Sequence, residues 1–319
     1  MQLRLIAAVA IAIGLLAAGT ARAQSTATLQ GLVTDAQGAV MPGVSVTIKN
    51  TATGVERVVV TSGAGEYVAA SLAPGHYKVV SHIDGFSEQT REIDLGVAQT
   101  VVMNTKLSLG TLAENVTVSG AAPLIETATV SVGQVMAERT VQEIPLNGRH
   151  FVDLGPLMPG GITPPQNAGL SAPLRGQGSF SFFSAGNRET SVNFMLNGVN
   201  LNDLSNSQVT FQPSINTVSE FKVDNSTFSA EYGRNSGAIV NVATRSGANA
   251  FHGEGFDFYR DDKYDSRNVF NPEPNPKSPF NRKQFGFNLG GPIVKNKTFF
   301  FYSYEGLRHL QGVDLNAGC

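Results

Sequence analysis

The histidines and aspartates are the residues of this chain whose types could support metal-dependent chemistry. A zinc hydrolase needs about three protein ligands and a general base. His76 and His82 are six residues apart, on one face of a predicted strand, and neither is followed three residues later by a glutamate. Asp257, Asp261 and Asp262 could bind a hard cation, but they lack the glycine-bearing loop and terminal glutamate of an EF-hand. We therefore expect solvated or packed histidines, a solvated aspartate loop and no metal site.

Other catalytic patterns are absent from the sequence. It contains no G-x-S-x-G nucleophile elbow, no G-x-x-x-x-G-K-[ST] phosphate loop and no G-x-G-x-x-G dinucleotide motif. The single cysteine, Cys319, cannot form a disulfide framework or a thiolate cluster. We therefore expect a protein that is not an enzyme, with no catalytic residues and no cofactor.

The charge composition limits the classes of partner. The 319 residues carry 23 basic and 25 acidic side chains, for a net charge of -2, and they contain no basic run. Nucleic-acid binding usually requires a basic patch on the protein surface. We therefore exclude nucleic acid as a partner.

The first 23 residues have the pattern of an export signal. Arg4 gives a positive start, Leu5 to Ala18 is apolar, and Ala21-Arg22-Ala23 forms a small-x-small cleavage site. A membrane anchor is the alternative, but the apolar run is shorter than the ~20 residues that a bilayer helix needs. No later segment could be such a helix, so residence in a membrane would require β-strands. We expect an exported protein.

Residues 24–109 alternate short β-branched stretches with glycine and proline turns. Residues 44–49, for example, alternate Val, Val and Ile with Ser, Thr and Lys, as in a strand with one buried face. Pro42-Gly43 and Pro74-Gly75 are typical turn pairs. The block therefore predicts a compact β-sandwich, with strands expected at 28–34, 44–50, 55–61, 77–83, 89–95 and 100–107.

The order and spacing of these turns resemble those of the carboxypeptidase regulatory-like domain. The resemblance implies an immunoglobulin- or transthyretin-like β-sandwich over the whole block. A peptidase activity is not expected, because the zinc ligands and the base are missing. The matching stretches are Gly31-Leu32-Val33-Thr34-Asp35, Pro42-Gly43-Val44-Ser45-Val46, Gly65-Glu66-Tyr67 and Leu72-Ala73-Pro74-Gly75-His76-Tyr77.

Residues 110–123 form a linker with an extended segment at its centre. Val116 and Val118 alternate there with Asn115, Thr117 and Ser119. An unpaired extended strand can add to the sheet edge of another protein through main-chain hydrogen bonds. The alternative is that this segment is the first strand of the next domain, and the pattern alone favours that alternative.

Residues 124–249 combine helix and strand signals, which predicts an α+β domain. Val132, Val135 and Met136 share one face of an expected short helix, which Pro145 ends. Gly155 to Gly178 is too rich in helix and strand breakers for regular structure. Long loops of this kind are usually functional or mobile.

Strand signals follow that loop. Ser191 to Leu196 and Val199 flank Asn197-Gly198, a pair that suits a type I′ hairpin turn. Further strands are expected at 220–223 and 238–244.

This block resembles the plug domain of TonB-dependent receptors, especially of the Oar-like group. Five stretches match in order over most of the block, which implies a plug domain at residues 124–249. They are Ile144-Pro145-Leu146-Asn147-Gly148-Arg149, residues 193–200, residues 218–223, Ser229-Ala230-Glu231-Tyr232-Gly233-Arg234 and residues 237–247.

Residues 250–319 are the richest in aromatic side chains. Gln284 to Leu289 alternates Phe, Phe and Leu with Gly and Asn, and Thr298 to Glu305 is mostly aromatic. Such alternation is typical of transmembrane barrel strands with one face toward lipid. The alternative is a set of amphipathic strands in a soluble sheet. Phe251-His252-Gly253 and Tyr304-Glu305-Gly306-Leu307-Arg308 resemble the opening strands of an Oar-like barrel, which favours the membrane.

The predicted fold is therefore mainly β, with a β-sandwich, an α+β plug and the first strands of an incomplete transmembrane β-barrel. The resemblance implies an outer-membrane receptor for energised uptake of a large solute, with its N-terminal domain facing the periplasm. Its partners would be TonB, the outer membrane and an unknown extracellular ligand. A TonB box is expected at Glu114, Asn115, Val116, Thr117 and Val118.

Arg175, Gln177 and Phe180 are candidates for plug-loop side chains that face the ligand, although the loop could also be a plain flexible connection. Plugged transporters use about 22 strands, so we expect this chain to be the N-terminal fragment of a longer receptor. The alternative function is a non-transporting exported module that binds carbohydrate or protein. The chain has no Trp, the side chain that sugar-binding platforms commonly use.

Overall fold

The computed structural model describes residues 26–110, 116–119, 132–146, 149–162, 181–203, 207, 209–226, 232, 236–267, 271 and 273–312. The expected export signal at 1–23, Glu114 and Asn115 of the linker, and Arg175, Gln177 and Phe180 all lie outside these residues. Strands dominate the described part, which confirms the predicted mainly β class.

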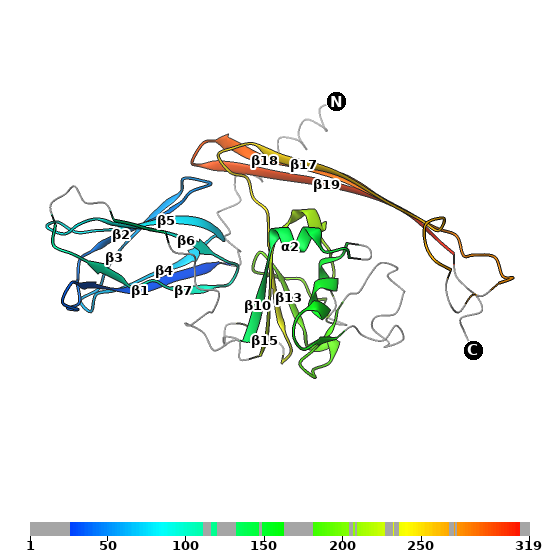
Figure 1. Ribbon diagram of the computed structural model, residues 1–319, viewed down its shortest axis with the longest axis horizontal. Coiled ribbons are helices and arrows are strands. Elements are labelled where there is room, and N and C mark those ends of the chain that lie inside the picture. The colour runs from blue at the N-terminus through cyan, green and yellow to red at the C-terminus, as the bar shows by residue number, and fades with distance from the viewer. Residues whose placement is uncertain are drawn as a thin grey trace, which may run out of the picture.

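The first unit, which we call the sandwich, is built from two sheets that share one core (Figure 1). One sheet has the order β4-β1-β7, with β8 pairing with the far end of β1, and the other has the order β3-β2-β5-β6-β9. The strands are β1 (Ala27–Asp35), β2 (Ser45–Asn50), β3 (Glu56–Val60), β4 (Glu66–Leu72), β5 (Gly75–His82), β6 (Gln89–Leu95), β7 (Thr100–Val102), β8 (Thr105–Leu107) and β9 (Val116–Ser119).

The alternation of apolar and polar residues explains the sandwich core. In β5, Tyr77 and Val79 are buried while the flanking His76 and Lys78 are exposed. Full burial of such a side chain stabilises a fold by about 1.5–3 kcal/mol. The expected β-sandwich is therefore confirmed, because each strand contributes one apolar face to the same core.

Two details of the sandwich differ from the expected strands. The stretch 100–107 is two short strands, because the chain turns aside at Met103 and Asn104, and Asn104 Oδ1 accepts a hydrogen bond of 3.0 Å from the Leu32 amide. The strand β4 was not expected at all. Its centre is Ala-Ala-Ser, so only Tyr67 and Val68 favour a strand locally, and its pairing with β1 completes the evidence.

The second unit, which we call the central unit, has a five-stranded sheet with the order β10-β15-β16-β13-β14. Its Asn197-Gly198 turn joins β13 to β14 with both residues at positive φ, 50° and 82°, which confirms the expected type I′ hairpin. Its elements are β10 (Val132–Ala137), α2 (Glu138–Glu143), η1 (Phe151–Leu157), β11 (Gly161–Ile162), β12 (Phe183–Ser184), η3 (Glu189–Ser191), β13 (Asn193–Leu196), β14 (Val199–Asn200), η4 (Ile215–Thr217), β15 (Val218–Ser226) and β16 (Ile239–Thr244).

The helix expected before Pro145 is present as α2, but its predicted extension over Val132, Val135 and Met136 was wrong. Residues 132–137 form the strand β10, which pairs antiparallel with β15, and the helix begins only at Glu138. Tertiary pairing overrides the helical spacing here, and Gly133 helps because a Cβ at that position would lie 2.6 Å from the Val223 carbonyl oxygen.

The stretch from Gly155 to Gly178 was expected to lack regular structure, but its first part contains a 3-10 helix and a short strand. Gly155 to Leu157 belong to the 3-10 helix η1, and Gly161 and Ile162 form β11. The reason is burial, since Phe151 and Leu154 of η1 are fully buried in the core of the central unit. Residues 163–178 lie outside the described part of the chain.

The third unit, which we call the strand sheet, consists of β17 (His252–Asp261), β18 (Phe280–Val294) and β19 (Thr298–Gln311). The strands pair antiparallel in sequence order and form a long ribbon above the central unit (Figure 1). A short turn at 295–297 joins β18 to β19, whereas the longer connection 262–279 joins β17 to β18. No helix in the described part of the chain combines the length and apolar character needed to cross a membrane.

Candidate functional site

The two faces of the strand sheet have opposite character. Gln284 and Asn288, both polar, are only 6% and 3% exposed. Phe287, Leu289 and Tyr302, all apolar or aromatic, are 47%, 43% and 55% exposed. Residues on alternate positions of a strand point to opposite faces, so the sheet hides its polar face and presents its apolar face outward.

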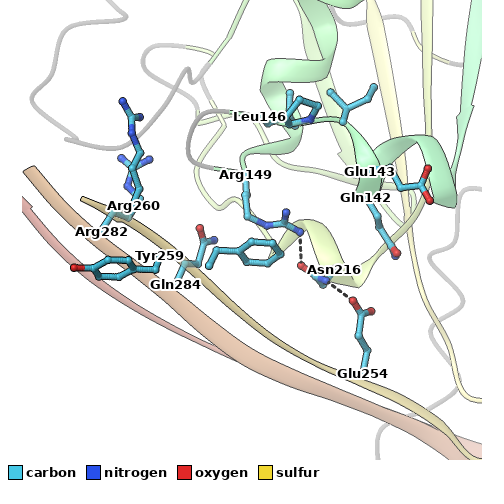
Figure 2. A pocket seen from close by; sticks show the side chains of 13 residues that line it. Gln142, Glu143, Leu146, Arg149, Asn216, Glu254, Tyr259, Arg260, Arg282 and Gln284 are labelled. Atoms are coloured by element: carbon cyan, nitrogen blue, oxygen red, sulfur yellow. Dashed lines mark hydrogen bonds between the residues drawn. The ribbon is translucent and has the colours of Figure 1, made fainter. Parts of the chain in front are cut away.

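A cavity of about 820 Å³ lies between the central unit and the polar face of the strand sheet (Figure 2). The segment from α2 to Arg149, together with Asn216 of η4, forms one wall, and β17 and β18 form the other. Its lining residues are Gln142, Glu143, Ile144, Pro145, Leu146, Arg149, Asn216, Glu254, Phe258, Tyr259, Arg260, Arg282 and Gln284.

Arg149 connects the two walls of the cavity. Its guanidinium carbon lies 3.7 Å from the centre of the Phe258 ring, and its Nη2 donates a hydrogen bond of 2.8 Å to Asn216 Oδ1. Asn216 in turn donates a hydrogen bond of 3.0 Å to Glu254 Oε1 on β17 (Figure 2). Burial lowers the pKa of Arg149, and the charges of Glu305 and Glu254 offset part of that effect.

Arg245 forms a second connection between these units. Its Nε donates a hydrogen bond of 2.7 Å to Glu138 of α2, and its Nη1 lies 3.2 Å from Glu254 of β17. One arginine therefore holds two carboxylates from different units, and its side chain is only 19% exposed. A partly buried ion-pair network of this kind is strongly sensitive to loss of one partner.

The sandwich contacts the central unit through one loop. The Val97 amide donates a hydrogen bond of 2.5 Å to Glu220 Oε2 of β15, and Lys222 Nζ donates one of 3.0 Å to the Ala98 carbonyl. Burial raises the pKa of Glu220, while the hydrogen bond from Val97 acts in the opposite direction. The loop between β6 and β7 is therefore fixed to β15.

A second loop of the sandwich reaches the short-turn end of the strand sheet. The Asn249 amide donates a hydrogen bond of 3.0 Å to the Ala52 carbonyl. Asn249 also exchanges hydrogen bonds of 2.7 and 2.8 Å with Asn296 in the turn between β18 and β19. The sandwich therefore lies at the end of the strand sheet that carries the short turn.

The candidate strand of the linker lies at the edge of the sandwich. Val116, Thr117 and Val118 belong to β9, which pairs in parallel with β6 as the last strand of its sheet. The sequence pattern allowed two interpretations of this segment, either an unpaired strand for another protein or the first strand of the next domain. Neither interpretation placed it in the sandwich. The expectation that it starts the next domain was therefore wrong in its pairing, because β9 completes the preceding sheet.

The histidines and aspartates that the sequence offered for metal chemistry lie apart. His76 faces Asp94 on the exposed side of the sandwich, and His82 Nε2 lies 3.7 Å from Asp84. Asp261 accepts hydrogen bonds from the Tyr259 hydroxyl at 2.6 Å and from other neighbours in the strand sheet. Among the residues that the structure describes, no three His, Cys, Asp or Glu side chains gather as a metal site would require.

The residues that join the three units were not singled out in the sequence. Arg245 and Glu220 fall within stretches that resemble the plug domain, but no spacing rule identifies their partners. Glu254 is more than a hundred residues from Glu138, the other partner of Arg245. Only the tertiary structure brings such distant residues together.

Two models of known protein families match this chain, one in its first third and one in its last quarter. Residues 28–108 match the model of the carboxypeptidase regulatory-like domain, and residues 243–317 match that of an outer membrane beta barrel domain. A protein of Myxococcus xanthus described as TonB-dependent transporter Oar is 28% identical over 312 residues, or 93% of this chain. The chain spans 28% of the length of that relative.

Some solved structures resemble a smaller part of the chain. The catechol 1,2-dioxygenase of an Acinetobacter species is 14% identical, with a TM-score of 0.25, over 31% of this chain and 60% of its own. A streptococcal ancillary pilin is 16% identical, with a TM-score of 0.23, over 27% of this chain and 33% of its own. Similarity at this level carries no functional argument.

The first domain model matches the sandwich, the second matches the strand sheet, and the relative matches the chain along most of its length. The chain is homologous to a TonB-dependent transporter, and it carries a carboxypeptidase regulatory-like domain followed by sequence of an outer membrane beta barrel domain.

Proposed function

We propose that this chain is part of an outer-membrane receptor that takes up a large solute with energy supplied through TonB. The observation that carries the proposal is the inverted burial of the strand sheet, which hides Asn288 and exposes Leu289. A strand whose apolar face meets lipid and whose polar face meets the lumen has this arrangement. In this proposal residues 24–109 are a periplasmic sandwich, 110–123 a linker with the TonB box, 124–249 a plug and 250–319 barrel strands.

The connections of the strand sheet support an orientation in the membrane. Outer-membrane barrels have short periplasmic turns and longer extracellular loops. The turn 295–297 would then be periplasmic, and the connection 262–279 would be extracellular. The sandwich contacts Asn296 through Asn249, so it would lie on the periplasmic side, where TonB acts.

The position of β9 supports a role as the TonB box. It is the outermost strand of its sheet, so one of its edges has no partner strand among the described residues. Only four residue pairs, from Gln89–Val116 to Glu92–Ser119, attach it to β6. An edge strand can accept a strand from another protein through its main chain.

A main-chain binding test examines this proposal without knowledge of the solute. The purified chain in detergent is titrated with the periplasmic domain of TonB, and binding is measured by surface plasmon resonance. Proline has no amide hydrogen and breaks strand pairing, so Val118→Pro is expected to abolish binding. The matched variant Val118→Ile keeps the main chain and is expected to bind as the wild type does.

Two results would contradict the proposal. If Val118→Pro bound TonB with wild-type affinity, the box would lie elsewhere in the chain. If the wild-type chain did not bind TonB at all, while it bound a carbohydrate or protein array, the chain would be a non-transporting binding module.

A further inference from the structure

Three basic side chains lie in a row across the strand sheet. Arg260 of β17 is directly opposite Arg282 of β18, and Arg282 is directly opposite His309 of β19. All three surround the Phe280 ring, with the two guanidinium carbons 4.7 and 5.5 Å from its centre and the imidazole centre 5.2 Å away. Arg260 and Arg282 are always charged, and like charges placed directly opposite each other destabilise a sheet, so this arginine pair needs negative charge beside it.

The neighbouring carboxylates do not supply that charge to Arg282. Arg260 is paired with Asp265 at 2.8 Å. The acids that line the cavity have other partners, because Glu254 pairs with Arg245 at 3.2 Å and Glu143 with Arg139 at 2.9 Å.

The Arg282 side chain has no ion pair or hydrogen bond with any residue that the structure describes, and its Nε is buried without a partner. Asp262 accepts a hydrogen bond of 3.3 Å from the Phe280 amide, and Glu305 accepts one of 2.8 Å from Gln284 while its charge acts on Arg149. The guanidinium of Arg282 is therefore a charge of the cavity that no described carboxylate pairs with.

The surroundings of Arg282 are those of a ligand site. Arg260, Arg282 and Arg149 all line the cavity of about 820 Å³, and Figure 2 shows the Arg260 and Arg282 side chains next to each other at one end of it. The charge of Arg282 also acts on the central unit. Burial lowers the pKa of His150, and the positive charge of Arg282 lowers it further. Two adjacent guanidinium groups offer the paired donors that carboxylate and phosphate oxygens accept.

We propose that Arg260 and Arg282 form the binding site for an oxyanion group, carboxylate or phosphate, of the transported solute. Both arginines lie at the end of the strands that leads into the connection 262–279, which faces the outside in the proposed orientation. The assignment of the anion to a transported solute rests on the proposed function, whereas the anion site itself rests on the arginine pair.

Anion titration of the whole chain tests the site directly. The purified chain in detergent is titrated with citrate and, separately, with pyrophosphate at low ionic strength, by isothermal calorimetry. Arg282→Gln is expected to weaken the preferred anion by about tenfold or more, the typical effect of losing a charge-assisted hydrogen bond. Arg57→Gln, which removes an exposed arginine of β3 in the sandwich, is expected to leave the affinity unchanged. Tighter binding of citrate identifies a carboxylate ligand, and tighter binding of pyrophosphate identifies a phosphate ligand.

Thermal unfolding without any anion separates a binding role from a structural one. Removal of Arg282 relieves its repulsion with Arg260, so Arg282→Gln is expected to raise the Tm of the free chain, while added anion raises the Tm of the wild type more than that of the variant. The proposal is overturned if the wild type binds neither anion, if Arg282→Gln binds as tightly as the wild type, or if this variant lowers the Tm.

Failure of the anion site and failure of the proposed function give different results. Arg282→Gln leaves the TonB-binding strand intact, and Val118→Pro leaves the arginine pair intact. Loss of anion binding in the first variant with normal TonB binding supports the site, whatever the second variant does.

Discussion

The sandwich and the strand sheet use the same sequence alternation with opposite results. In β5 of the sandwich, Tyr77 and Val79 are buried and the polar Lys78 between them is exposed. In β18 of the strand sheet, the polar Gln284 and Asn288 are buried, while the apolar Leu289 is exposed. The sandwich pairs two apolar faces with each other, whereas the strand sheet packs its polar face on the central unit. A period of two residues thus predicts a strand, and what each face meets depends on the units around it.

The stability of the sandwich should depend on its own core. Ile48 is fully buried between the two sheets, so Ile48→Ala is expected to lower the free energy of unfolding by about 2–5 kcal/mol. Val58→Ala, at a side chain that is 58% exposed, is expected to change it by less than about 0.5 kcal/mol. Denaturant unfolding of the chain measures both, and equal losses would contradict a core shared by the two sheets.

A charged substitution sharpens the comparison because it distinguishes water from lipid. Leu289 and Val58 are similarly exposed, at 43% and 58%. In a lipid bilayer, Leu289→Lys is expected to cost about 2–4 kcal/mol, whereas Val58→Lys is expected to cost less than about 0.5 kcal/mol.

Guanidinium unfolding of the complete receptor of which we propose this chain is part, folded in phospholipid vesicles, gives the free energy for each lysine variant, because an open sheet leaves its edge backbone groups unsatisfied in lipid. If the two substitutions had the same small effect, the exposed face of the strand sheet would meet water, and the sheet would be soluble.

The contact of Glu220 with the sandwich predicts a smaller effect on stability, and this effect depends on pH. Burial raises the pKa of Glu220 above its ordinary value of 4.5, so the folded chain holds this proton more tightly than the unfolded chain. This contribution to stability is complete below pH 4.5 and is lost as the pH rises through the folded pKa. Glu220→Gln cannot ionise, so its Tm is expected to exceed that of the wild type increasingly as the pH rises above 4.5.

Tm values of the wild type and Glu220→Gln, measured from below pH 4.5 upward, test whether the Tm difference grows with pH as expected. Glu66→Gln, at an exposed carboxylate of β4, is the matched control. A Tm difference for Glu220→Gln that is the same at every pH would show that the Glu220 carboxyl does not respond to its burial.

Much of the fold could be predicted because its signals are local. The Asn197-Gly198 turn specifies a hairpin by the positive φ that both residues adopt, and the β-branched residues of 44–50 specify a strand. Predictions failed where pairing decided the structure. Val132 to Met136 has helical spacing but pairs with β15, and residues 116–119 pair with β6 rather than with the unit that follows.

The candidate site could be predicted only in part. The sequence places Val116 and Val118 in an extended segment but contains no information about the sheet edge to which it adds. The Arg260–Arg282 pair has no sequence signature, because the register of β17 and β18 sets which residues are opposite each other. The same holds for Arg245, whose two carboxylate partners come from α2 and β17.

The sequence by itself determined the strand-rich composition, the order of the units and the absence of recognisable catalytic motifs. These properties depend on local spacing, on turn residues and on residue types, all of which are present in the linear chain. The tertiary structure alone decided what each strand face meets, where β9 adds and which charges meet in the cavity. Those outcomes depend on contacts between residues far apart in the chain, and long-range pairing is not encoded in any short stretch of it.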